Sequence, residues 1–119
     1  MIKSQAGWEQ IPQKNLEKTI LDRIITTREA TLVNLMIIKK ITSDYFEDPI
    51  HKNICEYIFS QFNESWNVPS EVAIESLFSG YIVSPRTDSI TLALDELIFR
   101  WTTKVARDIN YKITSEINA

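Results

Sequence analysis

The sequence predicts an all-α fold, with a compact head of about four helices followed by one long amphipathic helix. Residues that break helices are rare among its 119 residues, because glycine occurs only twice and proline only four times. Between these breaks, apolar residues recur at the three- and four-residue spacing of one helical face. We expect an N-terminal extension (1–14), the helical head (15–80), a loop (81–88) and the long helix (89–119).

The first two predicted helices differ in how much of their surface is apolar. The first begins near Asn15, a plausible N-cap, and has one apolar face: Leu16, Ile20, Leu21, Ile24 and Ile25. The second covers residues 28–41 and is apolar on almost every side: Leu32, Val33, Leu35, Met36, Ile37 and Ile38. A helix that is apolar all round is typical of a protein interior, so we expect the second helix to be a core helix.

The next two helices have recognisable starts. Asp48 offers a capping carboxylate and Pro49 occupies the first helical position, where its missing N–H costs nothing. The apolar face of this third helix follows: Ile50, Ile54, Tyr57, Ile58 and Phe62. A loop is expected over 63–69, ending at Pro69, and Ser70 then caps a short fourth helix. That helix carries Val72, Ala73, Leu77 and Phe78, with Gly80 expected at its C′ position.

The last helix is long enough to extend beyond the head. It runs from about Ser89 to Ile117 without proline or glycine, and at 1.5 Å per residue it spans about 42 Å. A compact chain of this length has a radius of gyration of only about 14 Å. We therefore expect its far half to need a partner surface, with Trp101 serving either that interface or the head's core. The candidate self-association residues are Leu97, Ile98, Trp101, Val105, Ile109 and Ile113.

Charge and hydropathy narrow the class of partner. Residues 1–40 carry a net charge of +3, residues 41–90 a net −6, and residues 91–119 a net zero. Nucleic-acid-binding domains present clustered Lys and Arg, so the acidic middle block argues against tight, direct binding of nucleic acid. The block is either a solvated surface or a docking face for a basic partner. Without a secretory signal or an apolar run that could span a membrane, we expect a cytoplasmic protein.

The residues that catalysis and cofactor binding need are missing. The only glycines are Gly7 and Gly80, so the sequence has no P-loop for ATP. His51 is the only histidine and Cys55 the only cysteine; they stand one helical turn apart, and we interpret them as structural residues. The two cannot form the four-ligand shell of a structural zinc site. We expect no enzymatic activity, metal or cofactor in this chain.

The middle of the chain carries a spacing of residues found in a known family. Phe46 precedes His51 by five positions, Ile54 follows His51 by three, and Pro49 opens the same predicted helix. This pattern resembles the N-terminal domain of DnaB-type hexameric replicative DNA helicases. The Pro69–Ser70 pair is similar to that family's entry into its fourth helix. The resemblance covers about residues 16–79 and looks closest to the helicases of T4-like bacteriophages.

The resemblance implies a docking domain. In this family the N-terminal domain is a helical head followed by a helical hairpin, and it forms a collar over the ATPase ring. Hairpins pair between subunits, which implies a homo-oligomer, either a dimer or a trimer of dimers. The collar also recruits primase and, in some systems, a helicase loader. ATP and Mg²⁺ belong to a separate C-terminal domain, which performs strand translocation.

Two other functions are compatible with the sequence. One is a stand-alone adaptor or inhibitor that mimics this domain and binds a helicase or a primase, since the helicase-binding domain of primases has a similar helical fold. The other is a small nucleic-acid-binding protein, which the acidic block disfavours. The reading frame after Ala119 discriminates the first two hypotheses, because a downstream P-loop indicates the helicase and a stop codon the adaptor.

Overall fold

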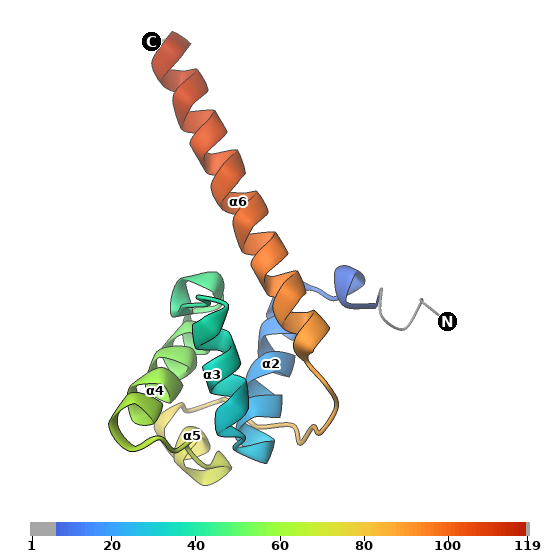
Figure 1. Ribbon diagram of the computed structural model, residues 1–119, viewed down its shortest axis with the longest axis vertical. Helices are drawn as coiled ribbons and strands as arrows, with labels where there is room; N and C mark the ends of the chain where they lie inside the picture. The colour runs from blue at the N-terminus through green and yellow to red at the C-terminus, as the bar shows by residue number, and fades with distance from the viewer. Residues whose placement is uncertain (1–6, 119) are drawn as a thin grey trace.

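The computed structural model describes residues 7–118, apart from the side chains of Tyr111 and residues 113–118. Within this range every regular element is a helix, so the expected all-α fold is confirmed. Helices α2 to α5 form the head, and α6 rises away from it as a rod (Figure 1). The elements are η1 (Gly7–Gln10), α2 (Gln13–Thr27), α3 (Ala30–Ile38), η2 (Ser43–Tyr45), α4 (Pro49–Ser65), α5 (Glu71–Leu77) and α6 (Thr91–Asn118).

The projecting rod explains the overall dimensions of the molecule. The extents are 52 × 39 × 28 Å and the radius of gyration is 15.9 Å. A compact chain of this length would have a radius of gyration of about 14 Å. Part of α6 therefore lies outside the volume of the head, as Figure 1 shows.

Helix α2 is the central helix of the head. The five apolar residues predicted for its face are all buried: Leu16, Ile20, Leu21, Ile24 and Ile25. The helix begins at Gln13 with Pro12 at the N-cap position, so the prediction that Asn15 caps it was wrong. Asn15 instead lies exposed in the first turn. The helix also buries two carboxylates, Glu17 and Asp22, which the apolar pattern did not predict.

Helix α3 is shorter and more exposed than expected. Only Val33 and Met36 of this helix are buried, while Ile37 is 49% exposed and Ile38 is 74% exposed. The prediction of a core helix was therefore wrong. The helix lies at the surface of the head and packs through one side, so apolar residues on its other side face solvent.

Helix α4 starts where the sequence predicted. The Asp48 carboxylate accepts hydrogen bonds from the backbone N–H groups of Ile50 (2.9 Å) and His51 (3.4 Å). Pro49 occupies the first turn. The predicted face is buried at Ile54, Ile58 and Phe62, whereas Ile50 is 44% exposed because it lies on the outer side of the first turn. The helix continues to Ser65, through the expected start of the 63–69 loop, and ends at Trp66 with a positive φ of 61°.

Helix α5 is a short surface helix. As predicted, the Ser70 hydroxyl accepts a hydrogen bond from the backbone N–H of Ala73 (3.2 Å). The apolar face predicted for this helix is largely wrong, since Val72 is 73% and Leu77 is 58% exposed while Ile74 is buried. Gly80, with φ of 89°, lies two residues beyond the C-cap and not at the C′ position.

Residues 81–90 form an extended segment, here called the strap, that is hydrogen-bonded to side chains of α2. The Tyr81 hydroxyl donates to the buried Asp22 carboxylate (2.6 Å), and Lys18 Nζ donates to the carbonyl of Ile82 (2.7 Å). Burial and this hydrogen bond raise the pKa of Tyr81, so the phenol remains a donor. Arg23 Nε donates to the carbonyl of Asp88 (2.6 Å). These bonds fix the strap, and with it the point at which α6 begins.

The first half of α6 is part of the head. Ala93, Leu94 and Leu97 in its first two turns are buried, and so is Ile90 just before the helix. The Arg100 guanidinium donates to the carbonyls of Trp8 (3.0 Å) and Ile11 (2.7 Å), which ties the segment after η1 to α6. Further along, Trp101 stacks on Tyr45 of η2, with ring centroids 5.0 Å apart. Beyond this contact α6 leaves the head.

Candidate protein-docking surfaces

The residues predicted for self-association on α6 fall into three groups. Leu97 is fully buried in the head, so it belongs to the core and offers no surface to a partner. Ile98 and Trp101 pack partly against the head, which gives Trp101 an intradomain role. Val105 is half-buried and Ile109 is 52% exposed. The side chain of Ile113 lies outside the described residues.

Trp101, Val105 and Ile109 form the apolar side of α6 where the helix leaves the head. They are four residues apart, which places them on one side of the helix. Lys104 Nζ lies 5.9 Å from the centre of the Trp101 ring, a distance consistent with a cation–π contact. Among the described side chains, no ion pair involves a residue after Arg100. Lys104, Arg107 and Asp108, on this part of the rod, thus have no ion-pair partner among the described side chains.

Two further apolar residues of α6 are exposed, and the sequence pattern did not predict them. Phe99 is 65% exposed and Leu92 is 44% exposed. Neither belongs to the four-residue repeat through Val105 and Ile109, so the repeat could not indicate them. They lie on other sides of the same helix.

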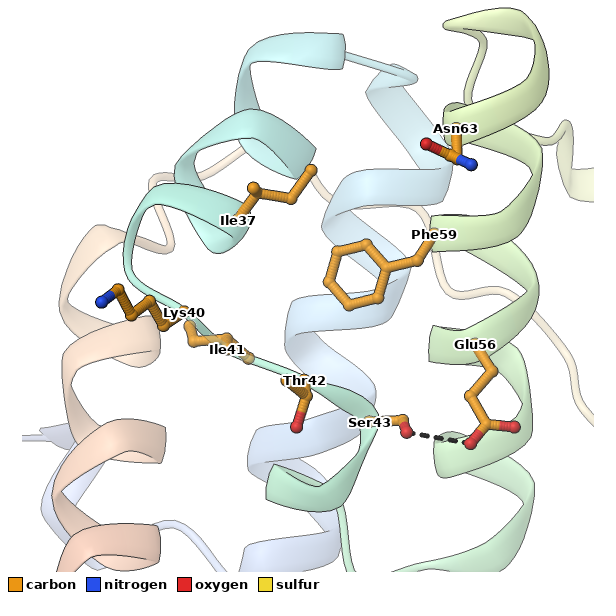
Figure 2. A pocket seen from close by; sticks show the side chains of 8 residues that line it. All are labelled: Ile37, Lys40, Ile41, Thr42, Ser43, Glu56, Phe59 and Asn63. Atoms are coloured by element: carbon orange, nitrogen blue, oxygen red, sulfur yellow. Dashed lines mark hydrogen bonds between the residues drawn. The ribbon is translucent and has the colours of Figure 1, made fainter.

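A second surface is a groove between α3 and α4, with a volume of about 520 Å³. Figure 2 shows Ile37 of α3 and Phe59 of α4 pointing into the space between the two helices, with Ile41 below them. Lys40 stands on the α3 side and Glu56 on the α4 side. The Ser43 hydroxyl donates to the Glu56 carboxylate (2.9 Å). The groove thus has an apolar floor, with the Glu56 carboxylate on its α4 side, while the Lys40 side chain extends from the end of α3 away from Phe59 and Glu56 (Figure 2).

The end of α3 shapes this groove. The backbone N–H of Lys40 donates to the carbonyl of Ile37 (3.0 Å), and that of Ile41 donates to the carbonyl of Met36 (2.9 Å). This pair of bonds is the Schellman arrangement, which needs a left-handed residue at the C′ position. Lys40 holds that position with a φ of 63°. The turn buries Ile41 and leaves the Lys40 side chain exposed to solvent.

The residues that carry the resemblance to DnaB-type helicases lie mostly inside the head. Phe46, His51 and Ile54 are all buried, and so is Pro69. Pro49 and Ser70 act at helix starts. These residues therefore specify the fold of the head, and a partner would have to bind elsewhere.

His51 belongs to a buried polar cluster centred on Glu17. The Glu17 carboxylate accepts hydrogen bonds from His51 Nδ1 (2.9 Å), from the backbone N–H groups of Glu47 (2.6 Å) and Asp48 (3.2 Å), and from the Gln13 amide (2.7 Å). Burial acts to raise the pKa of Glu17, but these hydrogen bonds outweigh burial and lower it below its ordinary value. Glu17 thereby joins α2 to the corner between η2 and α4. The pattern of apolar residues could not indicate this cluster, because Glu47, Asp48 and His51 are 30 or more residues away from Glu17 in the chain.

Cys55, the other residue considered for catalysis or metal binding, is buried in the core. Burial raises the pKa of its thiol, with the nearby Glu56 and Glu17 carboxylates acting in the same direction. A buried cysteine that stays protonated behaves as a small apolar residue. Within the described part of the chain, no group of three or more His, Cys, Asp or Glu side chains is placed to hold a metal ion. No helix there is long and apolar enough to cross a membrane.

Comparisons with protein-family models, curated proteins and solved structures find no significant match to this chain. Its function is therefore inferred from the chemistry of the two surfaces and from the sequence pattern.

Proposed function

We propose that the chain is the N-terminal assembly and protein-docking domain of a DnaB-type replicative DNA helicase, and that it acts by binding other proteins. The observation that carries this proposal is the apolar side of α6 outside the head. Val105 is half-buried and Ile109 is 52% exposed, on a helix that continues to Asn118. A helix that presents such a side to solvent gains free energy when another helix covers it.

Each apolar residue that a partner covers adds to this gain. Full burial of one Val or Ile side chain contributes about 1.5–3 kcal/mol relative to exposure. Trp101 lies next to these residues and is itself only partly covered by the head. Aromatic residues at the centre of an interface often contribute the most to affinity. In the proposed function, α6 pairs with a second copy to form a dimer, or a trimer of dimers.

Primase and a helicase loader are the further partners in this proposal. The sequence pattern at Phe46, His51 and Ile54 supports it, because this pattern resembles that of the helicase head, and all three residues are buried here. ATP and Mg²⁺ would act in a separate C-terminal domain. The alternative is a stand-alone adaptor or inhibitor that carries the same head and binds a helicase or a primase.

The reading frame downstream of Ala119 discriminates between these functions. The proposal predicts that the frame continues into a segment with a P-loop, two glycines five positions apart followed by Lys and Ser or Thr. A stop codon directly after Ala119 would contradict it and favour the adaptor.

A further inference from the structure

We propose that α6 of a second copy packs antiparallel on α6, with the two-fold axis of the dimer near Asn110. In this arrangement Asp108 of each copy pairs with Lys112 of the other. The inference rests on the proposed self-association of α6 and adds to it the direction and the register of the partner helix. The position of the head and the charges beside the apolar side of α6 carry it.

The head determines which direction the partner helix can take. Trp101 stacks on Tyr45 of η2, and Val105 and Ile109 continue the same side of α6. The head therefore stands on the side of α6 that the partner has to cover. Packed helices lie about 8–10 Å apart, whereas the shortest extent of one molecule is 28 Å. In a parallel dimer both heads would be at the same end and would occupy the same space.

An antiparallel partner avoids this overlap, because its head lies at the far end of the rod, away from the first head (Figure 1). With the axis near Asn110, residue Asn118 of the second copy is level with Thr102, which is exposed. With the axis one turn closer to the head, at Ala106, Asn118 of the second copy would be level with Leu94. Leu94 is fully buried in the head, so the second helix would collide with the head in that register.

A row of charged residues lies beside the apolar side of the rod. Lys104, Asp108 and Lys112 are spaced four residues apart, so they share one flank of α6. On the other flank, Ala106 and Asn110 carry no charge. None of the three charged side chains takes part in an ion pair among the side chains that the structure describes. Each of them can therefore accept a partner of opposite charge.

This row is complementary to itself in an antiparallel pair. In such a two-fold pair each flank faces the same flank of the partner, and residues at equal distances before and after the axis face each other. About Asn110, Asp108 faces Lys112 of the second copy, and symmetry forms this ion pair twice. In a parallel pair the charged flank faces the uncharged one. Complementary charges at the border of the apolar contact therefore fix both direction and register.

Distances between spin labels measure the direction of pairing in the full chain. Thr102→Cys and Asn110→Cys provide exposed labelling sites, and the wild-type chain checks that the buried Cys55 stays unlabelled. In the antiparallel dimer the labels at 110 lie close together near the axis. The labels at 102 are separated by about 24 Å along the rods, at 1.5 Å per residue. Electron paramagnetic resonance distinguishes this pattern from a parallel dimer, in which both label pairs are close.

Charge reversal tests the pair between Asp108 and Lys112. Lys112→Asp places two carboxylates opposite each other twice and should weaken the dimer about tenfold at low salt, equivalent to about 1.4 kcal/mol. The double variant Asp108→Lys/Lys112→Asp exchanges the two charges and should restore the wild-type affinity. Arg107→Asp is the matched control, because it makes the same change of charge two residues from Val105 and Ile109, on the opposite side of the helix. It should leave the affinity nearly unchanged in sedimentation equilibrium.

The outcomes separate this inference from the self-association on which it rests. Short distances at both 102 and 110, or a double variant as weak as Lys112→Asp, would overturn the antiparallel pair and leave self-association standing. Equal weakening by Arg107→Asp and Lys112→Asp would show that net charge, and not this ion pair, sets the affinity. A strict monomer without coupling between labels would contradict self-association itself, and the inference with it.

Discussion

Phe46 is fully buried where the chain turns from η2 into α4. Phe46→Ala leaves a cavity in the core and should lower the free energy of unfolding by about 3–5 kcal/mol. Asp48→Ala removes only a helix cap and should cost about 0.5–2 kcal/mol. Urea denaturation of both variants measures the difference. Equally small losses would contradict the packing described for Phe46.

Glu17 makes the stability of the head dependent on pH. Its pKa in the folded protein is lower than its ordinary value of 4.5, so its carboxylate contributes stability above that value. The contribution is lost as the pH falls through the folded pKa. Glu17→Gln should therefore lower stability at neutral pH and reduce the loss of stability between about pH 5 and pH 3.

Urea denaturation at several pH values tests the role of Glu17. Glu71→Gln is the matched control, because Glu71 is an exposed carboxylate in the first turn of α5. If Glu17→Gln and Glu71→Gln change the acid dependence equally, the hydrogen bonds of Glu17 do not contribute as described.

At the scale of elements, the backbone conformation at the end of α3 is locally unfavourable. Lys40 adopts a left-handed φ of 63°, which is unfavourable by about 1–2 kcal/mol for residues with a Cβ. Lys40→Gly should therefore raise the free energy of unfolding by about 1 kcal/mol.

Lys39→Gly is the comparison for Lys40→Gly, and it also removes the ion pair between Lys39 Nζ and the Asp95 carboxylate (3.0 Å). Lys39 has a right-handed φ of −77°, where glycine gives no relief and increases the freedom of the unfolded chain. Thermal and urea denaturation should show opposite signs for the two variants. A loss of stability in Lys40→Gly would contradict the proposed cost.

The sequence predicted those helix starts that are set by residues close together in the chain. The start of α4 at Asp48 and Pro49 and the cap of α5 at Ser70 are local interactions, and both are confirmed. The exposure of α3 could not be predicted, because periodicity shows that a helix is apolar but not which sides have neighbours. The burial of Glu17 depends on partners distant in the chain.

The candidate surfaces were predictable only in part. The length and the apolar repeat of α6 indicated a rod with uncovered residues at Val105 and Ile109. The repeat could not show where the head ends, so Leu97 was grouped with them although it is buried. The α3–α4 groove was not predicted, because it depends on the left-handed turn at Lys40, a position where glycine is the usual signal.

For the whole molecule, the proposed docking role predicts that two activities of replicative helicases, ATP hydrolysis and tight binding of single-stranded DNA, are missing from this chain. The chain should not hydrolyse ATP, because it lacks a P-loop. It should also bind single-stranded DNA no more tightly than about micromolar at physiological salt, because residues 41–90 are acidic. A phosphate-release assay and a DNA titration measure both. Sub-micromolar binding would instead favour the nucleic-acid-binding hypothesis.

Self-association through α6 is the central claim, and sedimentation equilibrium of the full chain tests it most directly. We expect a dimer or higher oligomer between micromolar and millimolar concentration. Ile109→Asp should weaken association strongly, because it places a charge in the apolar side of α6. Phe99→Asp is the matched control, since Phe99 is exposed on the same helix outside that repeat, and it should change association little. A strict monomer across the whole concentration range, or equal effects of the two variants, would contradict the claim.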